Sequence, residues 1–143
     1  MKERKQVGTK TTTKRSEVES TYQSMFRHAA FFNFAFAVIF GLFQETLLPW
    51  LGMGPLANEA FLHLFLGLVF IFGISYYWVS LDLSQNRAVV WLGFLGKSLV
   101  VLLLLAHLFQ SNISLRFASL GLLDLWYATR FICFLADQSL LKK

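Results

Sequence analysis

Four long apolar segments constrain this chain more than any other feature of its sequence. They cover residues 29–48, 60–80, 88–109 and 116–136. Each contains about 20 residues, and a helix of that length rises about 30 Å, the thickness of the hydrocarbon core of a bilayer. We therefore predict a single domain of four membrane-spanning helices within residues 25–143.

The composition and the connections between the segments favour one architecture. Hydrophobic residues make up 56% of the chain and charged residues only 15%, whereas a soluble domain carries about 25% charged residues. No segment alternates polar and apolar residues as a transmembrane β-strand does. The connections are short and carry turn residues, so consecutive helices are expected to be antiparallel. The predicted fold is an all-α integral membrane four-helix up-down bundle.

The N-terminal residues 1–24 have a different composition. They are rich in Lys and Thr and poor in large apolar side chains, which predicts a disordered tail. Six of the 13 Lys and Arg residues lie in the first 15 positions. Because this basic tail precedes an apolar span, its expected partners are anionic lipid headgroups, and we expect no nucleic-acid binding.

The distribution of basic residues predicts the orientation in the membrane. Ten of the 13 basic residues lie on the side that holds the N-terminal segment, the loop 81–87 and the C-terminal lysines, whereas the opposite side holds only Arg116. Basic residues concentrate in cytoplasmic segments of membrane proteins. We therefore predict that both termini are cytoplasmic.

The third segment contains "GFLGKS", which resembles the end of a phosphate-binding loop. That loop requires a glycine where this chain has Trp91, and a strand before it, so a nucleotide site is excluded. Lys97 instead lies about 13 Å inside the predicted span, with Gly93 on the same helical face. Asp124 in the antiparallel fourth span comes within about 6 Å of the same level. We predict a direct or water-bridged Lys97–Asp124 pair; the alternative is that Lys97 extends toward the inner headgroups.

Further polar residues are candidates for the same cluster or for a metal site. Asn33 is placed to complete a polar cluster around the pair, and Arg130 either contacts Tyr76 or extends toward the cytoplasmic headgroups. His63 and His107 are both expected near the outer side. Two histidines alone are a weak metal signal, so no metal site is predicted.

Several stretches carry a resemblance to a known group of proteins. The stretches "AAFFNF", "LPWLGMG", "FGISYYWVSLDLSQNRAVVWLGFLGK" and "LGLLDLWYATRF" resemble small bacterial four-helix integral membrane proteins that are loosely DoxX-like. The resemblance covers residues 29–135, and Leu123 stands where relatives often carry Asn. It implies a multi-pass protein of the bacterial inner membrane, membrane redox chemistry and quinone-linked partners. The recurring positions that it assigns are Asn33, Pro49, Gly73, Tyr76 or Tyr77, Asp82, Gly93, Gly96, Lys97 and Asp124.

These features lead to one functional expectation with two alternatives. We expect a small binding or accessory membrane protein whose Lys97–Asp124 pair faces a lipid-like or quinone-like ligand, with no other cofactor. The alternatives are a proton- or ion-coupled carrier or membrane redox enzyme that uses the pair as a relay, and a purely structural protein. No nucleophile–base set is evident, which argues against an enzyme. The small extramembrane mass favours a homo-oligomer or a larger membrane complex.

Overall fold

The computed structural model describes the backbone of residues 3–137 and the side chains of residues 15–137. The described backbone is all-α, without strands. Its helices are α1 (Glu3–Trp50), α2 (Glu59–Leu81), α3 (Arg87–Phe109), α4 (Leu115–Ala118) and α5 (Gly121–Ala136). The short α4 leads into α5, and the two together form the fourth apolar segment, Leu115–Ala136. The predicted four-helix, all-α fold is confirmed.

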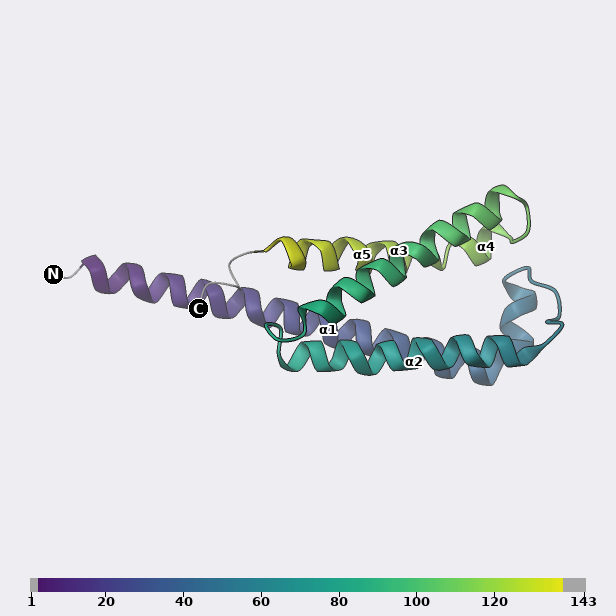
Figure 1. Ribbon diagram of the computed structural model, residues 1–143, viewed down its shortest axis with the longest axis horizontal. Coiled ribbons are helices and arrows are strands. Elements are labelled where there is room, and N and C mark those ends of the chain that lie inside the picture. Colours follow the sequence, from purple (N-terminus) through teal and green to yellow (C-terminus); the bar gives the residue numbers. More distant parts are fainter. Residues whose placement is uncertain (1–2, 138–143) are drawn as a thin grey trace.

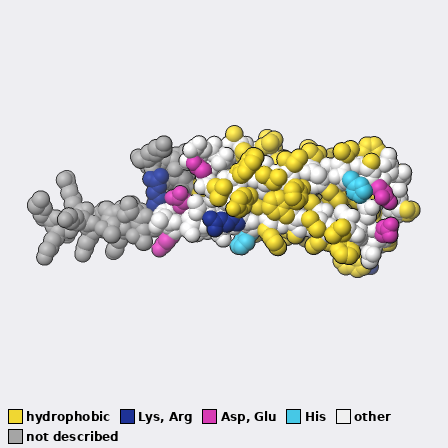
Figure 2. Space-filling view, turned by 90° about the horizontal axis from the view of Figure 1, so that it is seen from below, with side chains coloured by type: hydrophobic (Ala, Val, Ile, Leu, Met, Phe, Trp, Pro, Cys, Tyr) yellow, Lys and Arg dark blue, Asp and Glu magenta, His cyan; other side chains and the backbone are white. Residues whose placement is uncertain are grey.

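Within the described residues, four helical segments have the length and the apolar composition needed to cross a membrane. Three of them, α2, α3 and Leu115–Ala136, agree with the predicted spans to within one residue at each end. On the face in Figure 2, hydrophobic side chains cover the middle of the molecule and charged side chains lie toward its ends. This distribution is the one that a hydrocarbon layer around the middle of the bundle requires.

Helix α1 is longer than the sequence predicts. It begins at Glu3, so the backbone is helical from residue 3 to 24, where the composition predicts disorder; Met1 and Lys2 lie outside the described residues. Tyr22 packs on α5, with its ring centroid 5.0 Å from that of Phe134. This contact anchors the helix before the apolar span begins, and adding turns to an existing helix costs far less than starting one.

The helices pack as two pairs. Helix α1 lies along α2, and α3 lies along α5, whereas the contact between α2 and α3 is much less extensive (Figure 1). The two pairs meet near the end of the bundle that holds the α2–α3 connection and the end of α5. There the ring of Phe26 in α1 packs on Phe131 and Phe134 of α5, with ring centroids 5.1 and 5.2 Å apart. We call this tightly packed region the aromatic core.

Both ends of the bundle have contacts that fix the register of the helices. At one end Arg87, the first residue of α3, donates a hydrogen bond of 2.5 Å to the carbonyl of Leu135 in α5. In the preceding turn, hydrogen bonds from the backbone of Gln85 and from Ser84 lower the pKa of Asp82. At the other end the Ser114 hydroxyl donates to the carbonyl of Leu51. The first contact joins the start of α3 to the end of α5, and the last joins the start of α4 to the end of α1.

Candidate functional site

The predicted ion pair is present between α3 and α5. The Lys97 ammonium lies 2.5 Å from a carboxylate oxygen of Asp124 and donates a hydrogen bond to it. Lys97 is only 7% exposed, whereas the side chain of Asp124 is 23% exposed. A buried ammonium needs such a partner, because removal from water destabilises its charged form by several kcal/mol.

Two tyrosine rings complete the surroundings of Lys97. Its ammonium lies 5.2 Å from the ring centroid of Tyr127 and 5.8 Å from that of Tyr76. Both distances are within the range of cation–π attraction. The sequence reasoning missed Tyr127, although its position three residues after Asp124 places it on the same face of α5.

Gly93 allows Tyr76 to reach this position. A Cβ atom at Gly93 would lie 2.7 Å from Cε1 and 2.8 Å from the hydroxyl of Tyr76, closer than real contacts permit. The neighbouring Gly96 differs, because a Cβ atom there would meet Phe72 at an ordinary 3.8 Å. The close-packing role therefore belongs to Gly93, while Gly96 lines open space.

That space is a cavity of about 410 Å³ between the helices, within the size range of small-molecule sites. Its walls are mainly aromatic and aliphatic, and four polar side chains face it. We call it the central cavity. The residues that line it are Phe32, Asn33, Phe36, Phe65, Leu68, Val69, Phe72, Tyr76, Gly96, Lys97, Leu99, Val100, Leu104, Phe117, Leu120 and Asp124.

The polar groups of the central cavity have hydrogen-bonding capacity that the described part of the protein does not use. Asn33 donates to the carbonyl of Val69 at 3.2 Å, which leaves its own carbonyl oxygen available. The Tyr76 hydroxyl and the second carboxylate oxygen of Asp124 make no hydrogen bond among residues 15–137. Donors and acceptors therefore converge on one end of an apolar cavity.

The central cavity opens sideways between α2 and α3. Its lining includes Leu68 of α2 and Leu99 of α3, which are 59% and 56% exposed. These side chains lie where α2 and α3 meet, a contact much less extensive than that of α1 with α2 or of α3 with α5. Toward the aromatic core the packing is closed, because Phe131 and Tyr76 are at most 1% exposed.

The other predicted site residues lie elsewhere. Arg130 is not among the residues of the central cavity; its guanidinium carbon lies 6.0 Å from the Trp126 ring centroid, in a separate groove against α1. Its place six residues after Asp124 turns it away from the pair, so the structure does not bring it to Tyr76. His63 and His107 are exposed, and no group of three or more metal-binding side chains occurs within residues 15–137.

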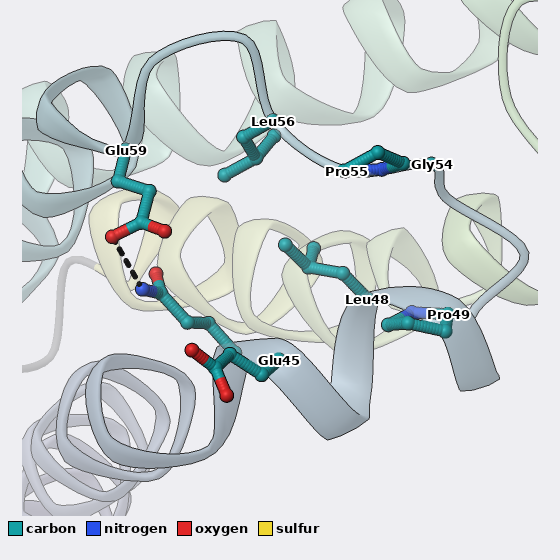
Figure 3. A pocket seen from close by; sticks show the side chains of 8 residues that line it. Glu45, Leu48, Pro49, Gly54, Pro55, Leu56 and Glu59 are labelled. Atoms are coloured by element: carbon teal, nitrogen blue, oxygen red, sulfur yellow. Dashed lines mark hydrogen bonds between the residues drawn. The ribbon is translucent and has the colours of Figure 1, made fainter.

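A second pocket, of about 350 Å³, lies at the loop between α1 and α2 (Figure 3). Pro49 lies in the last turn of α1, and Glu45 and Glu59 line the pocket from the two helices. Gln44 donates a hydrogen bond of 3.1 Å to Glu59, drawn as a dashed line in Figure 3. This contact joins the ends of α1 and α2 and gives the pocket a structural role.

Comparisons with known proteins assign no function to the central cavity. A scan against family models, a search of curated proteins and a search of solved structures each find no match for this chain. The resemblance to DoxX-like proteins stays a prediction from the sequence.

Proposed function

We propose that this chain is a multi-pass membrane protein that binds a lipid-like or quinone-like molecule in the central cavity. Lys97 and Asp124 receive its polar head, and the apolar part lies along the α2–α3 opening. The observation that carries the proposal is the position of a buried ion pair in the wall of a cavity that is otherwise mainly apolar. Such cavities with a few convergent polar groups are typical of ligand sites.

The charges favour a neutral head group. The ammonium of Lys97 and the carboxylate of Asp124 offset each other at 2.5 Å, so an anionic head would meet the carboxylate and a cationic head the ammonium. A carbonyl accepts from Lys97 or Tyr76, and a hydroxyl donates to Asp124 or Asn33. Quinones, quinols and hydroxyl-bearing lipids have these groups.

The alternatives use the same pair in other ways. A relay of protons or ions to the cytoplasmic side would need a path through the aromatic core, where Phe26 and Phe131 are fully buried. A purely structural pair would need no cavity beside it and no unused hydrogen-bonding groups. These two observations favour binding, and we assign the protein an accessory rather than a catalytic role.

The setting of the protein belongs to the same proposal. The bundle lies in an inner membrane with both termini cytoplasmic, and the basic start of α1 contacts anionic headgroups. A second copy or a larger membrane complex covers part of the apolar surface. Gly41 is a candidate contact point, because a Cβ atom there would meet only Leu66 at 3.8 Å.

Filling the central cavity tests the proposal without touching the ion pair. Gly96→Phe places a ring in the cavity, and Gly67→Phe is the matched control on α2, outside the cavity lining. The probes are decylubiquinone and dioctanoylglycerol, added to the protein in detergent and followed by thermophoresis. We expect Gly96→Phe to weaken binding of at least one probe more than about tenfold, equivalent to 1.4 kcal/mol, and Gly67→Phe to leave it unchanged.

The comparison of probes identifies the ligand class. Tighter binding of decylubiquinone indicates a quinone-like ligand, and tighter binding of dioctanoylglycerol indicates a lipid-like one. Equal binding of each probe to Gly96→Phe, to Gly67→Phe and to the unmodified protein would contradict the proposal.

A further inference from the structure

Arg130 lines a second groove with polar side chains, separate from the central cavity. The groove has a volume of about 410 Å³ and lies between α1 and α5. We call it the Arg130 groove. Its lining residues are Ser20, Thr21, Ser24, Met25 and His28 of α1, with Trp126 and Arg130 of α5.

The guanidinium of Arg130 has no polar partner among residues 15–137. Its Nε atom is buried and makes no hydrogen bond, and no described carboxylate forms an ion pair with it. The nearby Asp137 instead accepts a hydrogen bond from Tyr22 at 3.5 Å. A guanidinium without a polar partner is costly away from water, so a ligand that supplies oxygen atoms to its accessible nitrogens would stabilise this site.

The remaining groups of the groove suit an anion with several oxygens. Arg presents a planar fork of donors that matches phosphate, and the hydroxyls of Ser20 and Ser24 add further donors on the facing helix. His28 is exposed beside them and supplies another nitrogen donor. In contrast to the ion pair of the central cavity, the lining of this groove contains no carboxylate.

The groove lies at the level where headgroups begin. His28 immediately precedes the first apolar segment, and Arg130 lies about 9 Å from the end of α5 by the helical rise. The groove's deeper end is at Trp126, which is 53% exposed and lies about 15 Å from the end of α5 by the same rise. Ser20 and Ser24 precede the first apolar segment, and the Arg130 side chain can extend toward the interface, so a phosphate group at the bilayer surface can contact both.

We infer that the Arg130 groove binds a phosphate group, contributed by an anionic lipid headgroup or by free phosphate in solution. The inference is independent of the central cavity, because the two sites share no lining residue. It assigns Arg130 to recognition of an anion.

Native mass spectrometry of the intact protein in non-ionic detergent tests this inference. The probes are dioctanoyl phosphatidylglycerol, dioctanoylglycerol, which lacks the phosphate, and inorganic phosphate. Arg130→Gln removes the guanidinium, and Arg27→Gln is the matched control, because Arg27 is exposed on the same surface but does not line the groove. We expect Arg130→Gln to weaken binding of phosphatidylglycerol about tenfold or more and Arg27→Gln to change it less than about threefold.

Two further experiments identify the source of the phosphate group and control for misfolding of the Arg130 variant. Inorganic phosphate that displaces the lipid from the unmodified protein but not from Arg130→Gln identifies free phosphate as an occupant, whereas failure to compete identifies the headgroup. Ser20→Ala/Ser24→Ala alters only exposed hydroxyls and is expected to weaken binding several-fold while the fold is retained. Equal losses in Arg130→Gln and Arg27→Gln, wild-type phosphatidylglycerol binding by Arg130→Gln, or an equal loss of dioctanoylglycerol binding in Arg130→Gln would overturn the inference.

Discussion

Two basic residues, Lys97 and Arg130, lie within the apolar spans, and their surroundings differ. Lys97 has a carboxylate at 2.5 Å and two tyrosine rings within 6 Å. Arg130 has one indole ring at 6.0 Å and a buried nitrogen without a hydrogen-bond partner in the described part of the chain. The carboxylate of Asp124 compensates the charge of Lys97, whereas the phosphate group that we infer would compensate the charge of Arg130.

Depth in the bundle explains the difference. A charge near the middle of the membrane has no water or headgroup within reach, so a partner from a neighbouring helix must compensate it. An arginine closer to the end of its helix can extend its guanidinium toward the interface. Three predictions test this contrast, and their expected effects decrease from the first to the third.

Breaking the ion pair is expected to have the largest effect. Asp124→Asn leaves the 7%-exposed ammonium of Lys97 without its anion and should lower the free energy of unfolding by about 3–5 kcal/mol. Lys97→Met should cost less, because Asp124 is more exposed. The measurement is denaturant titration in mixed detergent micelles, followed by circular dichroism.

The double variant Lys97→Met/Asp124→Asn separates a structural role from a ligand-binding one. It contains no uncompensated charge, so its stability should recover to within about 1–2 kcal/mol of the unmodified protein. Recovered stability together with lost decylubiquinone or dioctanoylglycerol binding supports the proposed function. A double variant as unstable as Asp124→Asn would contradict the assigned energetics of the pair.

The surroundings of Lys97 can also be disturbed through Gly93. Gly93→Ala forces a methyl group against the fully packed Tyr76 and should destabilise the bundle by about 1–3 kcal/mol. Gly96→Ala, three residues away on the same helix, is the control, because its methyl group meets only Phe72 at 3.8 Å. The same titration compares the two variants, and equal stabilities would refute the assigned contact.

Removal of the second cation should have the smallest effect. Arg130→Met removes the cation–π contact with Trp126 and a charge that has no polar partner in the described residues. In detergent without phospholipid we expect a change within about 1 kcal/mol, the size of an exposed cation–π contact. A decrease in the free energy of unfolding as large as that of Asp124→Asn would contradict the difference assigned to the two cations.

Much of the fold follows from local features of the sequence. The apolar lengths define the spans, and the polar turns between them impose antiparallel neighbours. The helical rise then places Lys97 and Asp124 at nearly the same level, so their pairing is predictable without coordinates. Tyr127 follows from the same arithmetic, as a residue one helical turn from Asp124.

Packing between helices decides the rest, because it depends on distances that no single helix defines. The sequence does not reveal that α2 and α3 make much less contact than the other two consecutive pairs, and this difference leaves the α2–α3 opening and the central cavity. The six-residue spacing from Asp124 turns Arg130 away from the pair, but only the packing of α5 against α1 determines which groove Arg130 lines.

The sequence by itself determined a chain of four apolar helices with one lysine and one aspartate at matching depths. Hydrophobic length and helical rise are properties of single segments, so composition and spacing suffice to predict them. Only the tertiary structure decided that the pair borders a cavity and that Arg130 lies in a groove of its own. Cavities and grooves arise from the fit of side chains between helices, as the contact of Tyr76 with Gly93 shows.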